Sequence, residues 1–181
     1  MIVRERAIQE FSMKTQRTVL IVLLAAALFQ IAYYYPQLPA TVASHFGAGG
    51  QANGWASKEF FFGLYLGILA LMVLSFAGIP VVFRRIPPGL INLPNKDYWL
   101  APERVGSTVQ ALGREMLVFG NATIAFMVAV FELAIQANLS ESGRLPQSLM
   151  WILLAVYMLF TAIWLVQFYR RFARPPLESS G

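Results

Sequence analysis

Four long apolar stretches alternate with polar segments along the chain. The apolar stretches cover residues 19–35, 60–83, 116–136 and 149–169. A helix needs about 20 mostly apolar residues to cross a bilayer, and helices in soluble proteins are rarely so apolar on every face. Residues 15–18 can lengthen the first stretch to a full span. The pattern therefore predicts four transmembrane helices.

We expect these helices to form a single membrane domain over residues 1–181, as an all-α integral membrane protein. Its predicted segments, in chain order, are a tail (1–17), a first helix (18–35), a loop (36–59), a second helix (60–83), a loop (84–115), a third helix (116–136), a loop (137–148), a fourth helix (149–169) and a tail (170–181). A cleaved signal peptide is the alternative for the first helix. Its apolar stretch is longer than the usual ~7–15 residues and ends in tyrosines rather than small residues, so we expect the helix to be kept.

Composition agrees with a bilayer environment. The chain is 57% hydrophobic and only 13% charged, whereas soluble domains average about 45–50% apolar and about 25% charged residues. These values argue against a soluble enzyme, a nucleic-acid-binding module and a disordered chain. The chain has no cysteine, which excludes disulfides, thiolate zinc sites and thiol nucleophiles.

The basic residues predict the orientation of the helices. Of the 14 lysines and arginines, 12 lie in the segments 1–17, 84–115 and 170–181, and the other two are Lys58 and Arg144. Cytoplasmic loops of membrane proteins carry an excess of lysine and arginine. We therefore expect both termini and the central loop in the cytoplasm, and the loops 36–59 and 137–148 on the outside. Membrane topology accounts for the net charge of +5, so we expect no nucleic-acid partner.

The first outer loop has the pattern of an ordered segment. Residues 41–46 alternate enough for a short extended segment, and a glycine-rich turn follows. Asn53-Gly54 is typical of a tight turn, because both residues accept positive φ. Ser57 is a plausible N-cap for the second helix, with Glu59 in its first turn. We expect an ordered extracytoplasmic loop.

His45 is the only histidine in the chain. It is either a surface histidine hydrogen-bonded within the loop, or a ligand or proton-binding group on the outer face. A metal ion would need Glu59, Glu132 or Asn53 as further ligands, because no second histidine or cysteine completes a conventional zinc set. Metal binding stays open, and the sequence implies no cofactor.

The central loop contains four prolines, which prevent a long helix there. After Pro102, apolar residues recur at helical spacing from Val105 to Met116. This segment is either an amphipathic helix on the inner membrane surface or an extension of the third helix. Tyr98 and Trp99 are expected to anchor the preceding stretch at the lipid headgroups.

Two motifs resemble a known bacterial membrane family. The outer motif consists of Leu38-Pro39, His45-Phe46, Gly50, Gly54-Trp55 and Ser57-Lys58. It resembles the domain of unknown function 1648, a module shared with SdpI-type bacteriocin-immunity proteins. Residues 93–104 are similar to a cytoplasmic segment of many members, and they include the motif Asn95, Lys96, Asp97, Tyr98 and Trp99. The chain departs from the family pattern at Gly47 and at Ala52-Asn53.

The resemblance implies a multi-pass protein of the bacterial inner (plasma) membrane. SdpI-type relatives protect cells from a secreted toxin and hold a repressor at the membrane, but they are longer proteins. The resemblance thus implies an extracytoplasmic peptide or toxin as one partner, besides the lipid bilayer, and a cytoplasmic protein at residues 84–115 as another.

Polar residues inside the predicted helices form a further candidate site. Glu132 is the only ionisable acid or base within the four predicted helices, and such residues are costly in a membrane and often functional. Gln136 lies one turn above it, and Gln30 and Tyr65 fall at a similar depth. These groups either hydrogen-bond across helices to hold the bundle together or form an outward-facing polar pocket under the His45 loop. Gly63 and Gly67 form a small-residue face that we expect to pack within the bundle rather than at a dimer interface.

The candidate ligand-binding residues are therefore His45, Asn53, Trp55, Glu59, Glu132 and Gln30. The first hypothesis is a non-enzymatic membrane protein that binds an extracytoplasmic ligand, peptide or toxin, with an immunity or signalling role. The second is a small membrane enzyme or transporter that uses His45 and Glu132, although no nucleophile–base constellation is evident. The third is a structural subunit of a membrane complex.

Overall fold

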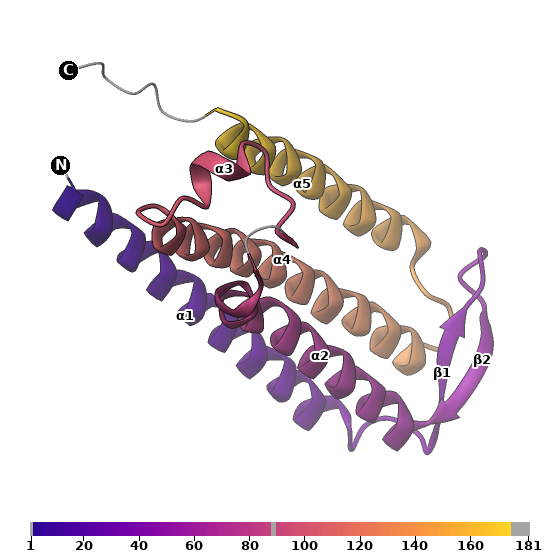
Figure 1. Cartoon of the computed structure of the whole chain (residues 1–181). Coiled ribbons are helices and arrows are strands. Elements are labelled where there is room, and N and C mark those ends of the chain that lie inside the picture. Colours follow the sequence, from indigo (N-terminus) through magenta and orange to yellow (C-terminus); the bar gives the residue numbers. More distant parts are fainter. Residues whose placement is uncertain (1, 88–89, 175–181) are drawn as a thin grey trace.

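The computed structural model describes residues 2–87 and 90–174 of the chain, and Figure 1 shows its arrangement. The elements, in chain order, are α1 (Ile2–Tyr34), β1 (Thr41–Phe46), β2 (Ala52–Ser57), α2 (Lys58–Arg85), α3 (Lys96–Trp99), α4 (Val105–Leu139) and α5 (Gln147–Ala173). Within these described residues, α1, α2, α4 and α5 are long and apolar enough to cross a membrane. The prediction of four such helices is confirmed.

The helices extend beyond the apolar stretches that predict them. α1 begins at Ile2, where the sequence predicts a tail. α4 begins at Val105, so the segment after Pro102 is an extension of the third helix and not a separate surface helix. Val109 and Leu112 of this extension are buried. The burial of this apolar face explains why α4 begins before the apolar stretch 116–136. Residues 175–181 of the predicted tail lie outside the described residues.

The long helix α4 lies at the centre of the bundle and packs against α1, α2 and α5 (Figure 1). α5 lies on the opposite side of α4 from α1. The β1–β2 hairpin covers one end of the bundle, which we call the hairpin end. The opposite end holds the start of α1, the end of α2, the start of α4 and the end of α5, and we call it the basic end. Basic side chains described there are Lys14, Arg17, Arg85, Lys96, Arg104, Arg114, Arg170, Arg171 and Arg174.

The main apolar core lies between α1, α2 and α4. Aromatic residues dominate the part of this core near the hairpin end, where the Tyr65 and Phe131 rings stack with centroids 3.9 Å apart. Closer to the basic end, α2 and α4 approach closely at Gly120. A Cβ atom at Gly120 would lie 2.6 Å from the Phe76 ring, so the absence of a side chain allows this contact.

The outer loop folds as an antiparallel hairpin, which adds a small sheet to the all-α fold that the sequence predicts. The extended segment predicted at residues 41–46 is strand β1. The tight turn predicted at Asn53-Gly54 is wrong, because both residues lie in β2 and the chain reverses between Phe46 and Ala52. Gly54 pairs with His45, and a Cβ there would lie 3.0 Å from the His45 Cβ. Glycine is thus present for a close cross-strand approach.

The hairpin tip is tied to the loop between α4 and α5. Gly50 has a φ of +72°, which glycine adopts without steric cost. Its carbonyl accepts a hydrogen bond from the Leu145 amide at 2.8 Å. A Cβ at Gly50 would come within 2.5 Å of the Leu145 carbonyl oxygen. Any larger residue would therefore displace the tip.

The start of α2 matches the sequence prediction, but one of its faces does not. The Ser57 hydroxyl caps the helix by accepting a hydrogen bond from the Phe60 amide at 3.2 Å. Gly63 and Gly67 were expected to pack inside the bundle. A Cβ at either position would meet nothing within 4 Å, so this face points outward and that expectation is wrong. α2 instead packs against the bundle through the face that carries its buried aromatic residues.

We predict that Gly120→Ala destabilises the bundle by about 1–3 kcal/mol, because the added methyl group overpacks the contact with Phe76. The thermal midpoint of the purified protein in neutral detergent measures this. Gly67→Ala, at an open position of α2, is the matched control and should leave the midpoint unchanged or slightly raised. Equal effects of the two substitutions would contradict the close approach.

Candidate functional site

Three polar side chains converge on Glu132, inside the membrane-spanning part of α4. Its Oε2 accepts a hydrogen bond from Gln30 Nε2 of α1 at 2.7 Å. Its Oε1 accepts from the Tyr34 hydroxyl at 2.9 Å and from Gln136 Nε2 at 2.7 Å. Gln30 and Glu132, both predicted as site residues, are therefore in direct contact. We call these four residues together with Tyr65 the Glu132 network.

Tyr65 extends the Glu132 network to α2. Its hydroxyl donates to Gln30 Oε1 at 2.8 Å, and the side chain is fully buried. Gln30 also donates to the Val128 carbonyl of α4 at 3.3 Å. One buried amide thus connects three helices. An unpaired polar group in an apolar interior costs free energy. Sliding of α1 along α2 or α4 would break these hydrogen bonds, so they favour one register of the three helices.

The chemistry of the network suits an ionised carboxylate. All three groups that contact Glu132 can donate hydrogen bonds, as an ionised carboxylate requires. In the described part of the chain, no lysine, arginine or histidine forms an ion pair with Glu132. The network therefore surrounds the Glu132 carboxyl with neutral donors and, among the described residues, offers it no countercharge.

A second polar contact joins α1 and α4 closer to the basic end. Asn121 Nδ2 donates to the Gln16 carbonyl at 2.9 Å and to Gln16 Oε1 at 3.0 Å. Asn121 is buried, and its own Oδ1 has no hydrogen-bond partner among the described residues. Asn121, Glu132 and Gln136 of α4 thus all face α1.

His45 belongs to a separate group on the hairpin. Its Nδ1 hydrogen-bonds to Oδ1 of Asn53 on the opposite strand, and both side chains are exposed. No hydrogen bond in the described structure connects this pair to the Glu132 network. A single pocket formed by His45 and Glu132 thus remains a prediction.

In the described structure, no hydrogen bond joins Trp55 or Glu59 to the His45–Asn53 pair or to the Glu132 network. Trp55 projects from β2 and is 63% exposed, as expected for an anchor at a membrane–water interface. Glu59 accepts a hydrogen bond from the Tyr35 hydroxyl at 3.2 Å. This bond to a carboxylate raises the pKa of Tyr35. Their role as ligand-binding residues stays a prediction.

The described acidic residues and His45 form no cluster that could bind a metal ion. Within residues 2–87 and 90–174, no three histidine, cysteine, aspartate or glutamate side chains come together in a way that could hold a metal ion. His45 bonds to an amide, and Glu132 bonds to two amides and a phenol.

The hairpin and its flanking helices are similar to a known family. Residues 20–69 match the family model described as "Domain of unknown function (DUF1648)". The chain carries a DUF1648 domain. The matched region begins in α1, includes the whole hairpin and ends in α2. Neither the curated proteins nor the solved structures contain a match to this chain.

The motif residues of the DUF1648 region have structural roles in the hairpin. Leu38 is buried in the main core. Lys58 closes the hairpin base, because its Nζ donates to the Tyr35 and Leu38 carbonyls, both at 3.3 Å. Together with the Ser57 cap and the close approach at Gly54, these contacts explain the residue types of the motif.

The DUF1648 region supplies only part of the Glu132 network. Gln30, Tyr34 and Tyr65 lie within residues 20–69, whereas Glu132 and Gln136 lie on α4, outside the match. The domain thus provides two of the three donors to Glu132, Gln30 and Tyr34, and the carboxylate and the third donor come from the rest of the chain. Tyr34 was not among the predicted site residues. Its position four residues after Gln30, like Gln136 after Glu132, places it on the same helix face.

Asn138 joins the hairpin to α4, a structural role that the sequence did not reveal. Its Oδ1 accepts from the Ala43 amide at 2.7 Å, and its Nδ2 donates to the Ala43 carbonyl at 3.0 Å. The side-chain amide therefore pairs with β1 as a neighbouring strand would, and fastens the hairpin to the end of α4. A polar residue at the end of an apolar helix is the only signal in the sequence.

The motif of residues 95–99, at the basic end, holds the last turn of α5 by hydrogen bonds. Asn95 Nδ2 donates to the carbonyls of Phe172 and Ala173 at 3.2 and 3.1 Å, and Trp99 Nε1 donates to the Phe172 carbonyl at 2.8 Å. These carbonyls belong to the last turn of α5, which lacks partners within its own helix. Tyr98 packs under the Arg104 guanidinium, 4.1 Å from the ring centroid. Binding of a partner protein at this motif remains a prediction, for which exposed Lys96 and Asp97 are available.

We predict that Asn138→Ala loosens the hairpin without unfolding the bundle. The Ala43 amide loses its acceptor, so its hydrogen exchange should accelerate about fivefold or more, as expected for the loss of one buried hydrogen bond. Hydrogen–deuterium exchange of the full-length protein measures this. Asn92→Ala, which changes an exposed asparagine at the other end, is the control; unchanged exchange at Ala43 in Asn138→Ala would contradict the assignment.

We predict that Asn95→Ala destabilises the protein by about 1–3 kcal/mol, because the Ala173 carbonyl loses its side-chain donor and the Phe172 carbonyl keeps only that of Trp99. The same variant should increase hydrogen exchange in the last turn of α5. Thermal unfolding and exchange at Phe172 measure the two effects. Asp97→Asn, an exposed change two residues away, should leave both at the wild-type level; if it matched Asn95→Ala, the capping role would be refuted.

Proposed function

We propose that the protein is a non-enzymatic, multi-pass protein of the bacterial inner membrane that binds an extracytoplasmic peptide or toxin at its hairpin end. The observation that carries this proposal is the Glu132 network, a carboxyl group held by neutral donors within a membrane-spanning helix. Ionisable groups at such depth are costly and mark functional sites in most membrane proteins.

The proposed orientation places the hairpin end outside the cell. The segments with 12 of the 14 basic residues belong to the tails and the central loop, and the start of α1 and the end of α5 lie together opposite the hairpin (Figure 1). The excess of lysine and arginine favours the cytoplasm for this end. A ligand that approaches from the outside would then meet the hairpin first.

The charge of the site indicates the chemistry of the ligand. A carboxylate in surroundings of low dielectric attracts a cation far more strongly than it would in water. The best-matched ligand presents an ammonium or guanidinium group, as a lysine- or arginine-containing peptide does. Gln136 is exposed. It lies one helical turn from Glu132 in the direction of the hairpin end, between Glu132 and the solvent there. The exposed His45, Asn53 and Trp55 offer further contacts for the rest of a peptide.

An immunity role agrees with this chemistry. The resemblance to SdpI-type proteins, which protect cells from a secreted toxin, supports a peptide toxin as the ligand. An enzymatic role has less support, because His45 hydrogen-bonds to the Asn53 amide rather than to a nucleophile. A transporter or a complex subunit would use the same bundle but would not need a fixed ligand at Glu132.

The proposal predicts that Glu132→Gln weakens binding of a cationic peptide about tenfold or more, since the attracting charge is lost while the side-chain volume is kept. The probe is a synthetic peptide of alternating lysine and leucine, with a glutamate–leucine peptide of equal length for comparison. Binding to the full-length protein in non-ionic detergent is measured by the change in tryptophan fluorescence.

Glu141→Gln is the matched control. It removes the same charge from an exposed position in the second outer loop and should leave the affinity within about twofold of wild type, because exposed charges contribute little. Equal affinity for the cationic and anionic peptides, or equal losses in the two variants, would refute a charge-specific site at Glu132.

A further inference from the structure

A cluster of charged side chains joins α4 and α5 at the basic end. Arg114 Nη2 and Arg171 Nη1 both donate to the same oxygen, Oε1 of Glu115, each at 2.7 Å. Arg114 and Glu115 are neighbours on α4, and Arg171 comes from the last turns of α5. Two positive charges therefore face one negative charge, and the cluster keeps one positive charge without a countercharge.

The cluster is shielded but reachable. The exposed fractions of the three side chains are 23% for Arg114, 33% for Arg171 and 15% for Glu115. An arginine has five N–H donors, and within the described structure the hydrogen bonds of these two guanidinium groups go to Glu115 alone. Both arginines thus keep free donors in a partly desolvated setting, where charge-assisted hydrogen bonds to an anion are strong.

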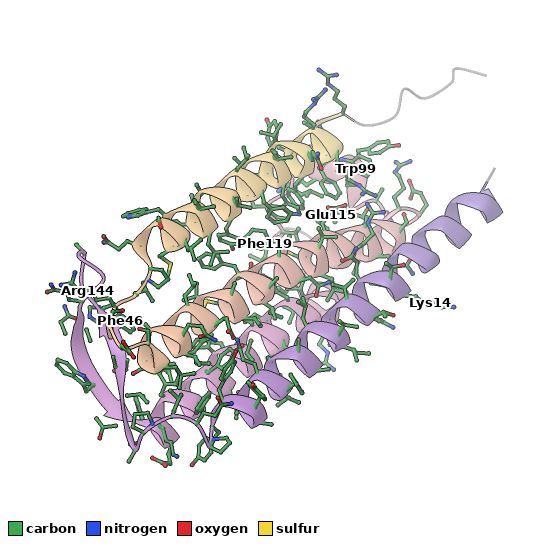
Figure 2. The ribbon with its side chains drawn as sticks, turned by 180° about the vertical axis from the view of Figure 1, so that it is seen from behind. Lys14, Phe46, Trp99, Glu115, Phe119 and Arg144 are labelled. Atoms are coloured by element: carbon green, nitrogen blue, oxygen red, sulfur yellow. The ribbon has the colours of Figure 1, made fainter. Side chains whose placement is uncertain are left out.

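An apolar helix surface adjoins the cluster. Above Arg171, α5 is exposed along the membrane-spanning part, where Val156 and Ile163, about a quarter turn or less around the helix from Arg171, are 62% and 49% uncovered. Figure 2 places Glu115 at the same end of the bundle as Trp99, away from the hairpin. An anion with hydrocarbon chains could therefore bring its charged group to the arginines and lay its chains along α5.

We propose that Arg114 and Arg171 bind the phosphate of an anionic phospholipid in the leaflet at the basic end. Basic sites between transmembrane helices are suited to lipid headgroups, and the exposed apolar face of α5 favours a lipid over a soluble anion. Glu115 positions both guanidinium groups and reduces their net charge to one. This lipid site is independent of the ligand proposed for Glu132.

The test measures binding of phosphatidylglycerol to the full-length protein in neutral detergent by native mass spectrometry. Inorganic phosphate and phosphatidylcholine are the comparison ligands. We expect phosphatidylglycerol to bind wild type about tenfold more tightly than phosphatidylcholine. Arg171→Gln and Arg114→Gln should each weaken phosphatidylglycerol binding about tenfold, because each removes charge-assisted hydrogen bonds.

Two further variants separate a lipid site from a structural ion pair. Arg170→Gln removes the same charge from the exposed neighbour of Arg171 and should change the affinity by less than about twofold. Glu115→Gln keeps both arginines and removes the competing carboxylate, so it should tighten phosphatidylglycerol binding. A merely structural cluster predicts instead that Glu115→Gln and Arg171→Gln act in the same direction.

The proposal is overturned by any of three results. Weaker lipid binding in Glu115→Gln would show that the ion pair, and not the arginines as ligands, matters. Equal losses in Arg170→Gln and Arg171→Gln would show unspecific attraction to the basic end. Inorganic phosphate that displaces phosphatidylglycerol at equal concentration would show a site for the soluble anion.

Discussion

The carboxylate of Glu132 imposes the constraint on which the bundle depends. A charged group inside a membrane-spanning helix must be hydrogen-bonded on every side that water cannot reach. α1 supplies Gln30 and Tyr34, α4 supplies Gln136, and α2 joins through the hydroxyl of Tyr65. The three helices that carry these groups are the same three that form the main apolar core. The Glu132 network and the apolar core thus hold the same three helices together.

The same kind of contact, between an asparagine side chain and the backbone, stabilises both ends of the bundle. At the hairpin end the side-chain amide of Asn138 pairs with the backbone of β1, and at the basic end that of Asn95 pairs with the last carbonyls of α5. In each case an asparagine satisfies backbone groups that regular secondary structure leaves unpaired. The two contacts differ in what they hold. Asn138 fixes the hairpin, whereas Asn95 fixes α5, which packs chiefly against α4.

The sequence predicted the helices well because apolar runs of membrane length have few alternative structures. It also located Gln30, Tyr65 and Glu132, since polar residues are conspicuous in apolar stretches. The hairpin turn was misplaced because Asn53-Gly54 satisfies the local rule for a turn, while the actual requirement at Gly54 is the close approach of His45. The outward direction of Gly63 and Gly67 could not be read locally either. It depends on which face of α2 meets α4, and the contact of Phe76 with Gly120 decides this.

The central claim is that Glu132 carries an unneutralised negative charge within the membrane. Infrared difference spectroscopy of wild type against Glu132→Gln, in lipid vesicles near neutral pH, tests it most directly. The account predicts that the substitution removes the stretching bands of an ionised carboxylate. Loss of the carbonyl band of a protonated carboxylic acid instead would contradict it, because a neutral Glu132 would attract no cationic ligand.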